Sequence, residues 1–503
     1  MSSADRGAGW IAAVTVLLSL IMAGCQVPGP PPAPRPEPTP TPTETRPFTV
    51  LSTDRIRVVD PAAVTESSSM VVSVNVFQRL MSADPGESML RPDAARDCLF
   101  TATTVYTCTL NDGLFFHNGN ELSSTDVKFS IERARRLAVP GSSATLLSAI
   151  RRIETPDPRT VRFILSRVDT QIGWALASPA ASLVDADSYE SGAVRAVGEA
   201  VIGSGPFSVT SYTRDVLQLE RFEKYVGRNP AQNEVVTYRT VADSAAIEEA
   251  MAKGTVDVAW RGLSGAAITR FSRQTAANPS DLTDDGYTLQ VLTGTRIRML
   301  QWSEAAIARF DRPARQAVSV AVQGERTLDS IVPGGVTGHV SSFPMGGRAE
   351  PLVTWAEPIP MTLSYDPTIP DGGDQANLVR SRLEDTGGFR VRLRPGVPDA
   401  DLTLVDRKAF TATGLSWLQP YLATPLPETA AIVNILQLRY RTVTQETEAQ
   451  RVLAALQRQA ALDLVLIPLT QSDEHIIARE GVTAPVNSFG PGWQLGLFGM
   501  RSG

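Results

Sequence analysis

Side chains that usually carry catalytic chemistry are scarce in this chain of 503 residues. Its three histidines, His117, His339 and His475, do not lie at the spacing of a metal site or of a catalytic triad. No Gly-x-Ser-x-Gly turn is present, and no serine stands three residues before any of the four lysines. We therefore expect no enzymatic activity, no cofactor and no bound metal.

The chain also lacks a basic block and, beyond its N-terminus, any apolar run of membrane-spanning length. Its net charge of −6 is spread along the sequence, which argues against nucleic acid as a partner. Arginine far outnumbers lysine, a bias that suggests a high-GC genome. The length is enough for two lobes with separate cores.

One apolar run is present, at residues 8–24, and it ends in Met22-Ala23-Gly24-Cys25. The run is short for a bilayer span and closes on small residues, which predicts a signal peptide over residues 1–24. Its end resembles a bacterial lipobox, in which Cys25 becomes the lipid-modified, palmitate-bearing N-terminus. A plain signal peptide and a short membrane anchor are the alternatives.

Residues 25–46 are rich in proline and threonine, a composition that cannot bury a core. We expect an extended linker that holds the body of the protein away from a membrane, or a disordered stalk. The other two cysteines, Cys98 and Cys108, flank β-branched and aromatic residues that favour two short antiparallel strands. In an exported protein this pattern predicts a disulfide, with free thiols or a metal pair as alternatives.

Residues 110–137 read as a strand, a polar turn and an amphipathic helix. The turn contains Asp112-Gly113, and Ser123 followed by Asp126 has the pattern of a capping box at the start of the helix. Turns and caps of this kind are common, so the residues by themselves predict scaffold rather than a binding site.

The order of residues in this stretch resembles the signature of the family 5 extracellular solute-binding proteins, which include the oligopeptide- and dipeptide-binding subunits of ABC importers. The matching positions are Leu110, Asp112, Gly113, Phe116, His117, Gly119, Leu122, Asp126, Val127 and Ser130. Similar segments elsewhere are Asp60-Pro61 and residues 203–207, 254–259, 315–317 and 464–469. The chain thus resembles a divergent member of the family, expected from an actinobacterium because of its arginine bias.

The resemblance implies an α/β fold of the two-lobed periplasmic-binding-protein type, with an interlobe cleft that closes on its ligand. On this interpretation lobe I comprises residues 47–78, 200–296 and 470–503. Residues 79–199 form an extra subdomain of lobe I, and residues 297–469 form lobe II. The expected state is a monomer.

Five residues are candidates for ligand contact: Trp260, Trp302, Ser303, Asp406 and Trp417. Each tryptophan follows a strand-like segment, where loops line a cavity or a core. Ser303 stands where family members often carry asparagine. Asp406 is a candidate partner for a cationic ligand group, the alternative being a solvated loop charge. The Asp-Pro pair common in peptide binders of the family is missing from residues 401–425, so the sequence does not support an anchor for a peptide amine.

These features predict a lipid-anchored receptor on the extracytoplasmic face of a bacterial cell membrane. It would bind a peptide or another small solute and deliver it to an ABC transporter permease. The alternative is a lipoprotein that keeps the fold but has a regulatory or scaffolding role in cell-envelope assembly, a hypothesis motivated by Ser303 and by the missing Asp-Pro pair.

Overall fold

The structure is a computed structural model that describes residues 46–83, 89–347, 355–484 and 495–502. The predicted signal peptide, Cys25 and the linker up to residue 45 lie outside these ranges. Within them, no helix is long and apolar enough to cross a membrane.

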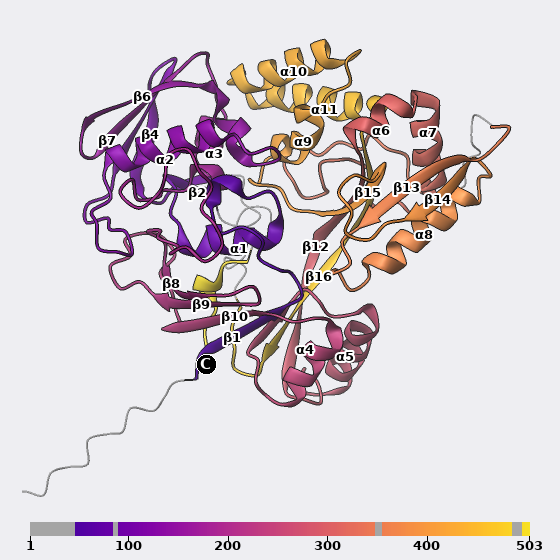
Figure 1. Ribbon diagram of the computed structural model, residues 1–503, viewed down its shortest axis with the longest axis horizontal. Coiled ribbons are helices and arrows are strands. Elements are labelled where there is room, and N and C mark those ends of the chain that lie inside the picture. The colour runs from indigo at the N-terminus through magenta and orange to yellow at the C-terminus, as the bar shows by residue number, and fades with distance from the viewer. Residues whose placement is uncertain (1–45, 84–88, 348–354, 485–494, 503) are drawn as a thin grey trace, which may run out of the picture. The chain divides into compact units, whose positions relative to one another are not determined.

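A ten-stranded mixed sheet runs through the described body of the chain (Figure 1). From one edge to the other its strands are β14 (Phe389–Leu393), β13 (Ile359–Tyr365), β15 (Leu402–Arg407), β12 (Tyr287–Trp302), β16 (Leu466–Arg479), β11 (Val258–Trp260), β1 (Phe48–Ser52), β10 (Val235–Thr240), β9 (Val216–Arg221) and β8 (Phe207–Tyr212). The central strands β12 and β16 have 16 and 14 residues and join the two halves of the sheet.

The central pair belongs to both halves because each strand has a different outer neighbour. The last residues of β12 pair with β15, whereas the last residues of β16 pair with β11. Between Leu292 and Arg296 the register of β12 against β16 shifts, so the ladder is interrupted where the strands pass from one half to the other. We use lobe I for the half with β11, β1, β10, β9 and β8, and lobe II for the half with β15, β13 and β14.

Lobe I carries a core on each face of its strands. Val50 of β1 packs in the core that contains α1 (Ser67–Val76) and η6 (Leu497–Gly499), and the next residue, Leu51, packs in the core with α4 (Ser244–Ala252) and α5 (Gly265–Ala277). This alternation is what a strand buried on both faces requires.

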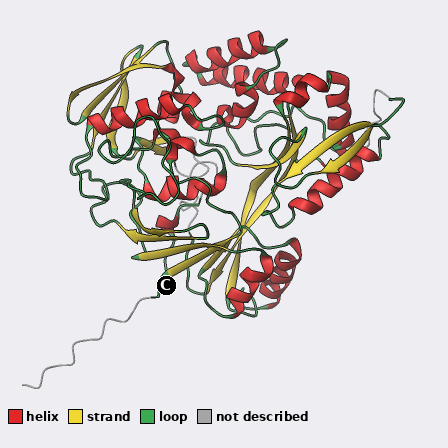
Figure 2. Cartoon of the chain, in the orientation of Figure 1, coloured by secondary structure: helices red, strands yellow, loops and turns green. Residues whose placement is uncertain are grey.

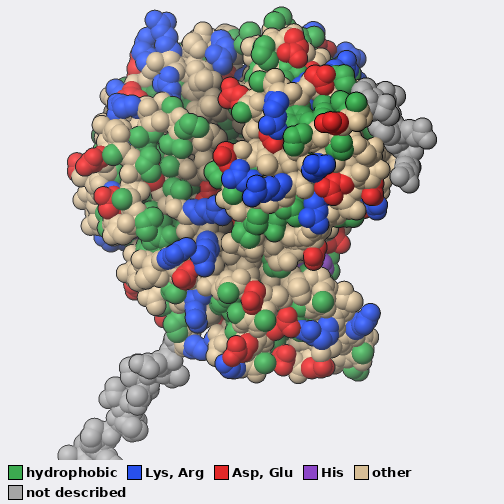
Figure 3. All heavy atoms as spheres, turned by 45° about the vertical axis from the view of Figure 1, so that its right-hand side comes forward, with side chains coloured by type: hydrophobic (Ala, Val, Ile, Leu, Met, Phe, Trp, Pro, Cys, Tyr) green, Lys and Arg blue, Asp and Glu red, His purple; other side chains and the backbone are tan. Residues whose placement is uncertain are grey.

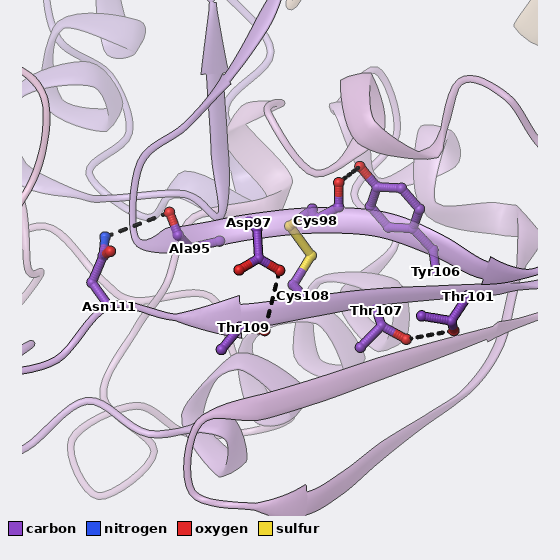
Figure 4. Close-up of a disulfide and its surroundings, with 9 residues drawn as sticks. All are labelled: Ala95, Asp97, Cys98, Thr101, Tyr106, Thr107, Cys108, Thr109 and Asn111. Carbon is purple, nitrogen blue, oxygen red and sulfur yellow. Dashed lines mark hydrogen bonds between the residues drawn. A yellow bond between two sulfur atoms is a disulfide. The ribbon is translucent and has the colours of Figure 1, made fainter.

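A subdomain with its own core accompanies lobe I. Its four-stranded sheet has the order β4 (Ala95–Ala102), β5 (Val105–Leu110), β7 (Thr160–Leu165) and β6 (Ile150–Asp157). The other elements are β2 (Met81–Ala83), β3 (Leu90–Pro92), α2 (Ser124–Leu137), α3 (Ile172–Ala175), η1 (Pro61–Ala63), η2 (Ser143–Ala149) and η3 (Pro179–Ala181). Cys98 of β4 and Cys108 of β5 are paired residues joined by a disulfide (Figure 4), as the sequence predicted.

Helix α2 begins with the predicted capping box. The Ser123 backbone N–H donates to the Asp126 carboxylate at 2.9 Å, and the Ser123 hydroxyl contacts the same carboxylate at 2.8 Å. Farther along, the Arg133 guanidinium donates to both carboxylate oxygens of Asp60, and both side chains are buried. The helix of the signature stretch is thereby fixed to the Asp60-Pro61 turn, which lies far from it in the sequence.

His117 connects the signature stretch to the turn at Gly203 and Gly205. Its Nδ1 accepts from the Gly203 N–H at 3.2 Å, and its Nε2 lies 3.1 Å from the Gly205 carbonyl oxygen, to which it donates. A Cβ atom on either glycine would come within 2.0 Å or 2.5 Å of backbone atoms of Val76, so this turn requires glycine. These contacts give His117 a structural position.

Helices flank the strands of lobe II (Figure 2), and each face of these strands has its own core. One core contains α6 (Glu304–Arg309), α7 (Arg312–Ala321) and α8 (Gly372–Glu384). The other contains α9 (Gly414–Ala423), α10 (Ala430–Thr442) and α11 (Glu446–Asp463), and η4 (Gln323–Glu325) follows α7. The residue boundaries predicted for the two lobes and the subdomain stay predictions.

Candidate functional site

The parallel strands of both lobes end where β12 and β16 cross between them. In lobe I, β1 is parallel to β11, and in lobe II, β13 is parallel to β15. Because β16 is antiparallel to β11, and β12 is antiparallel to both β16 and β15, the strands of the two lobes run in opposite directions. Their carboxyl ends therefore face each other. In open α/β sheets, ligands bind outside the carboxyl ends of the strands.

Arg261 follows β11 directly and places its guanidinium between carboxylates of both lobes. Its Nη1 lies 2.7 Å from Asp54 Oδ2, its Nη2 lies 2.8 Å from Asp406 Oδ2, and its Nε lies 3.0 Å from Glu474 Oε1. All four side chains are buried. Burial by itself lowers the pKa of Arg261, but the carboxylates of Asp406, Asp54 and Glu474 raise it well above its ordinary value. Arg261 is therefore a charged bridge between the lobes.

The backbone of Arg261 adopts the left-handed conformation, with φ at 56°. For a residue with a side chain this conformation costs about 1–2 kcal/mol. The ion pairs of Arg261 with Asp54, Asp406 and Glu474 offset this cost.

Further ion pairs surround Arg261. Lys408 Nζ lies 2.5 Å from Glu474 Oε2, Arg296 Nε lies 2.9 Å from Asp406 Oδ2, and Arg296 and Arg298 both contact Asp371 Oδ1. We call this set of eight side chains the charged cluster: Asp54, Arg261, Arg296, Arg298, Asp371, Asp406, Lys408 and Glu474. Its four carboxylates face four cationic groups, so the charge of the cluster is balanced within the protein.

Asp406 is held in its ionised form by this cluster. Burial raises the pKa of Asp406, but Arg261 and Arg296 lower it more strongly, and the result lies far below the ordinary value for an aspartate. Its Oδ2 receives both arginines, whereas its buried Oδ1 has no hydrogen-bond partner among the described residues. Asp406 therefore offers one free acceptor atom, but its negative charge is already neutralised.

A small pocket, with room for about one water molecule, lies between the subdomain and lobe II. Leu146, Gln171, Trp174 and Ala175 line it from the subdomain, and Thr411, Thr413, Leu415, Ser416 and Arg441 line it from lobe II. Two contacts join the subdomain to lobe II. Arg441 Nη1 lies 2.9 Å from Asp169 Oδ2, and Gln419 Nε2 donates to Thr145 Oγ1 at 2.7 Å. On the face in Figure 3, basic side chains gather near the middle of the molecule.

The three predicted tryptophans are buried in packing. Trp260 belongs to the first core of lobe I, Trp417 belongs to the core around α9, and Trp302 packs against Phe310 with ring centroids 5.0 Å apart. They support the strand ends and the helix that frame the site, and none of them lines the pocket described above. Their proposed contact with ligand stays a prediction.

Of the other two candidates, Asp406 lies in the charged cluster and Ser303 does not. Ser303 is the N-cap of α6, and its hydroxyl accepts from the Ala306 N–H at 3.2 Å. The sequence prediction missed Arg261, because this residue belongs to no recognisable motif. One feature could have identified it as a site residue: it is charged and directly follows a short, fully buried strand. Within the described ranges, no group of three or more His, Cys, Asp or Glu side chains is arranged to hold a metal ion.

Comparison with known proteins agrees with this architecture. Residues 90–368 match the sequence profile of the bacterial extracellular solute-binding proteins, family 5, middle region. The chain belongs to this family. The fold is that of two-lobed peptide-binding proteins: a dipeptide-binding protein from a Pseudoalteromonas species, solved with Met-Leu, superposes with a TM-score of 0.76 at 17% identity, over 91% of this chain and 100% of that one.

Curated relatives of this family 5 protein are distant. An HTH-type transcriptional regulator, SgrR, of Pectobacterium atrosepticum is 26% identical over 180 residues, 36% of this chain and 31% of the regulator. Di/tripeptide-binding protein 3 of Pseudomonas aeruginosa is 24% identical over 377 residues, 68% of this chain and 66% of that protein. The chain thus spans about a third of the length of the regulator and about two thirds of the length of the binding protein.

Proposed function

We propose that this family 5 protein binds a peptide or peptide-like solute outside the cytoplasm and presents it to an ABC transporter permease. The observation that carries the proposal is the convergence of strand ends from both lobes on one charged cluster. A solute held there contacts both lobes, so its binding favours the closed arrangement over an open one. The peptide-binding relatives support the class of solute.

The interruption of the β12–β16 ladder is the proposed hinge. Gly294 has φ at 67°, and its N–H donates to Asp473 Oδ1 at 2.8 Å. The two strands are paired on both sides of this point, so each lobe moves as a packed body while a few residues between Leu292 and Arg296 absorb the rotation.

Cys25 is the proposed lipid attachment site, and residues 25–46 are the proposed tether to the extracytoplasmic face of the membrane. We keep Asp406 as a proposed ligand contact through its free Oδ1 atom, which accepts an N–H group of the solute. Incorporation of a palmitate analogue into the full-length protein tests the anchor. Cys25→Ser is expected to abolish the labelling and to release the protein from the membrane, and equal labelling of the variant would contradict the anchor.

Calorimetry and thermal unfolding of the full-length protein test solute binding, with di- to pentapeptides, their N-acetylated forms and amidated forms as probes. A ligand present at about 100 times its Kd stabilises the folded state by about 2.7 kcal/mol, which is readily measured. The proposal expects at least one peptide class to bind and to stabilise.

Failure of all peptides to bind would refute solute capture. The regulatory or scaffolding alternative then predicts that cross-linking in cells recovers an envelope biosynthetic enzyme without permease subunits. Recovery of permease subunits together with peptide binding supports import.

A further inference from the structure

A buried ion pair joins the subdomain to lobe II. The side chains of Asp169 and Arg441 are 0% and 3% exposed, and within the described part of the chain Asp169 is the one carboxylate that pairs with Arg441. The subdomain itself orients this carboxylate, because Asp169 Oδ1 accepts from the Gln171 N–H at 3.0 Å. The two charges belong to different bodies of the protein, so the pair exists only while these bodies are in contact.

The end of α10 is capped across the same contact. The carbonyl oxygen of Arg441 lies in the last turn of this helix, where carbonyl groups lack an intrahelical partner. It accepts from the Thr170 N–H at 2.7 Å and from the Thr170 hydroxyl at 3.1 Å. A helix of lobe II therefore ends on hydrogen-bond donors that the subdomain supplies.

The neighbouring helix α9 contributes the contact of Gln419 with Thr145. Figure 1 shows α3, which Thr170 precedes, on the side of the subdomain that is turned toward lobe II. We call the residues that make these contacts the interlobe latch: Thr145, Asp169, Thr170, Gln419 and Arg441. The proposed hinge lies in the crossing strands, so a rotation about it separates the two sides of the latch.

Protein groups alone satisfy the interlobe latch. The charge of Asp169, the charge of Arg441 and the end of α10 each have a partner on the other body, so no atom of a solute is required to hold these surfaces together. A charge-assisted hydrogen bond that is removed from water is stronger than a neutral one, and three neutral hydrogen bonds act together with it. The latch therefore favours the closed arrangement whether or not the site is filled.

We propose that the interlobe latch holds the lobes closed in the solute-free protein, so that a solute enters and leaves only when the latch opens. The latch forms in the empty and in the filled closed state alike, so it slows association and dissociation together and does not weaken binding. This control of solute exchange rests on the proposed function, whereas the closed resting state can be tested without any solute.

Hydrogen exchange of the full-length protein without solute is the first test. The Thr170 N–H is bonded across the latch, so the segment that contains it is expected to be protected in the wild type. Asp169→Asn leaves Arg441 without a counter-charge as long as the lobes are closed, and opening returns the guanidinium to water. Exchange at Thr170 should therefore become at least about tenfold faster in this variant.

Two more variants separate opening of the lobes from a local effect. Arg441→Gln changes the other body and should accelerate exchange at Thr170 as Asp169→Asn does, which local unfolding of the Asp169 loop would not produce. Asp399→Asn, whose exposed pair with Arg394 lies within lobe II, is the matched control and should exchange like the wild type. A Thr170 segment that is unprotected in the wild type, or equally protected in both latch variants, would overturn the proposal.

A cross-link between the lobes measures closure directly. Thr145→Cys combined with Gln419→Cys places two thiols across the latch, and a short bifunctional thiol reagent is expected to join them in the solute-free protein. Adding Asp169→Asn should slow this cross-linking at least about tenfold, with the linked peptides identified by mass spectrometry. Cross-linking that is absent without solute, or that proceeds at the same rate with Asp169→Asn, contradicts the closed resting state.

Binding kinetics test the effect on solute exchange, with a peptide that the calorimetric screen identifies. Asp169→Asn should raise the association and dissociation rate constants together, by at least about tenfold, without lowering the Kd. Latch protection that depends on Asp169 and Arg441, with no peptide binding to any variant, supports the latch and refutes the proposed function. Peptide binding with Thr170 protected only after the peptide is added supports the proposed function and overturns the latch.

Discussion

Protonation of His117 should weaken the fold in a defined pH range. Burial lowers the pKa of His117 to about 4, whereas the free side chain titrates near 6.5. The neutral ring accepts from the Gly203 N–H and donates to the Gly205 carbonyl oxygen, and a second proton on Nδ1 would oppose the Gly203 N–H. The folded state therefore favours the unprotonated ring.

The direction and the size of the effect of His117 on the free energy of unfolding follow from proton linkage. Between about pH 6.5 and pH 4 the unfolded chain binds a proton at His117 that the folded chain does not, so stability rises with pH in this range. The contribution is fully present above pH 6.5 and is lost as the pH falls toward 4. A shift from 6.5 to about 4 corresponds to about 3 kcal/mol, with each pKa unit contributing about 1.4 kcal/mol.

Urea unfolding at several pH values between 4.5 and 7.5 measures this contribution. His117→Asn removes the ring and is expected to lower stability at pH 7.5, yet to lose less than the wild type as the pH falls. The difference between the two proteins should therefore shrink by about 2–3 kcal/mol across the range. His339→Asn is the matched histidine control, because the ring of His339 contacts the Val332 carbonyl oxygen and Asp329 instead of a backbone N–H. A wild-type-minus-His117→Asn difference that stays constant with pH would refute the reasoning.

Two further changes test the site and the subdomain. Arg261→Gln leaves buried carboxylates without their shared cation and should lower the free energy of unfolding by about 3–5 kcal/mol in urea titration. Arg57→Gln, the control, should lower it by less than about 1 kcal/mol, because the pair of Arg57 with Asp366 is exposed. Equal effects of the two changes would contradict the assignment of Arg261. Replacing Cys98 and Cys108 together by alanine opens a loop with a sequence separation of 10 and should cost about 2–3 kcal/mol, and reduction of the wild type should match the double variant.

Local features of this fold were predictable because their determinants are close in sequence. The capping box at Ser123 and Asp126 and the hairpin with Cys98 and Cys108 each depend on residues that lie within one or two elements. The signature stretch identified the family, and with it the two-lobed fold, although its side chains serve as scaffold. His117 shows why: its partners are backbone groups about 90 residues away, and both are internal to the fold.

Apolar patterning marks only part of each crossing strand, for a physical reason. The sequence is apolar at residues 297–302 and 464–469, but β12 starts at Tyr287 and β16 continues to Arg479. Polar and charged residues such as Glu474 interrupt both strands where they pass from one lobe to the other, although the far ends of the strands are buried again in the cores of lobe I. Apolar periodicity reports burial against a core, so it fails where a strand passes between two cores.

The charged cluster could not be predicted from the sequence, for a related reason. Its members come from three strand ends, the N-cap of α8 and both crossing strands, and no spacing in the sequence relates Asp54 to Arg261 or Arg261 to Glu474. Resemblance to the family led to Asp406, yet it could not show that the protein supplies Asp406 with two arginines of its own. The nearest available signal is topological: a charged residue directly after a short buried strand.

The charge balance of the charged cluster bears on how the amine end of a solute is recognised. Arg261 and Arg296 both contact Asp406 Oδ2, so a solute ammonium group that took this oxygen would have to displace an arginine of the protein. Such displacement is unfavourable, because it separates an ion pair already removed from water. The acceptor that remains on Asp406 is Oδ1, and the negative charge of this carboxylate is already neutralised through Oδ2. Recognition at Asp406 should therefore depend on an N–H donor of the solute rather than on its positive charge, so a peptide with a blocked amine is expected to bind as well as a free one.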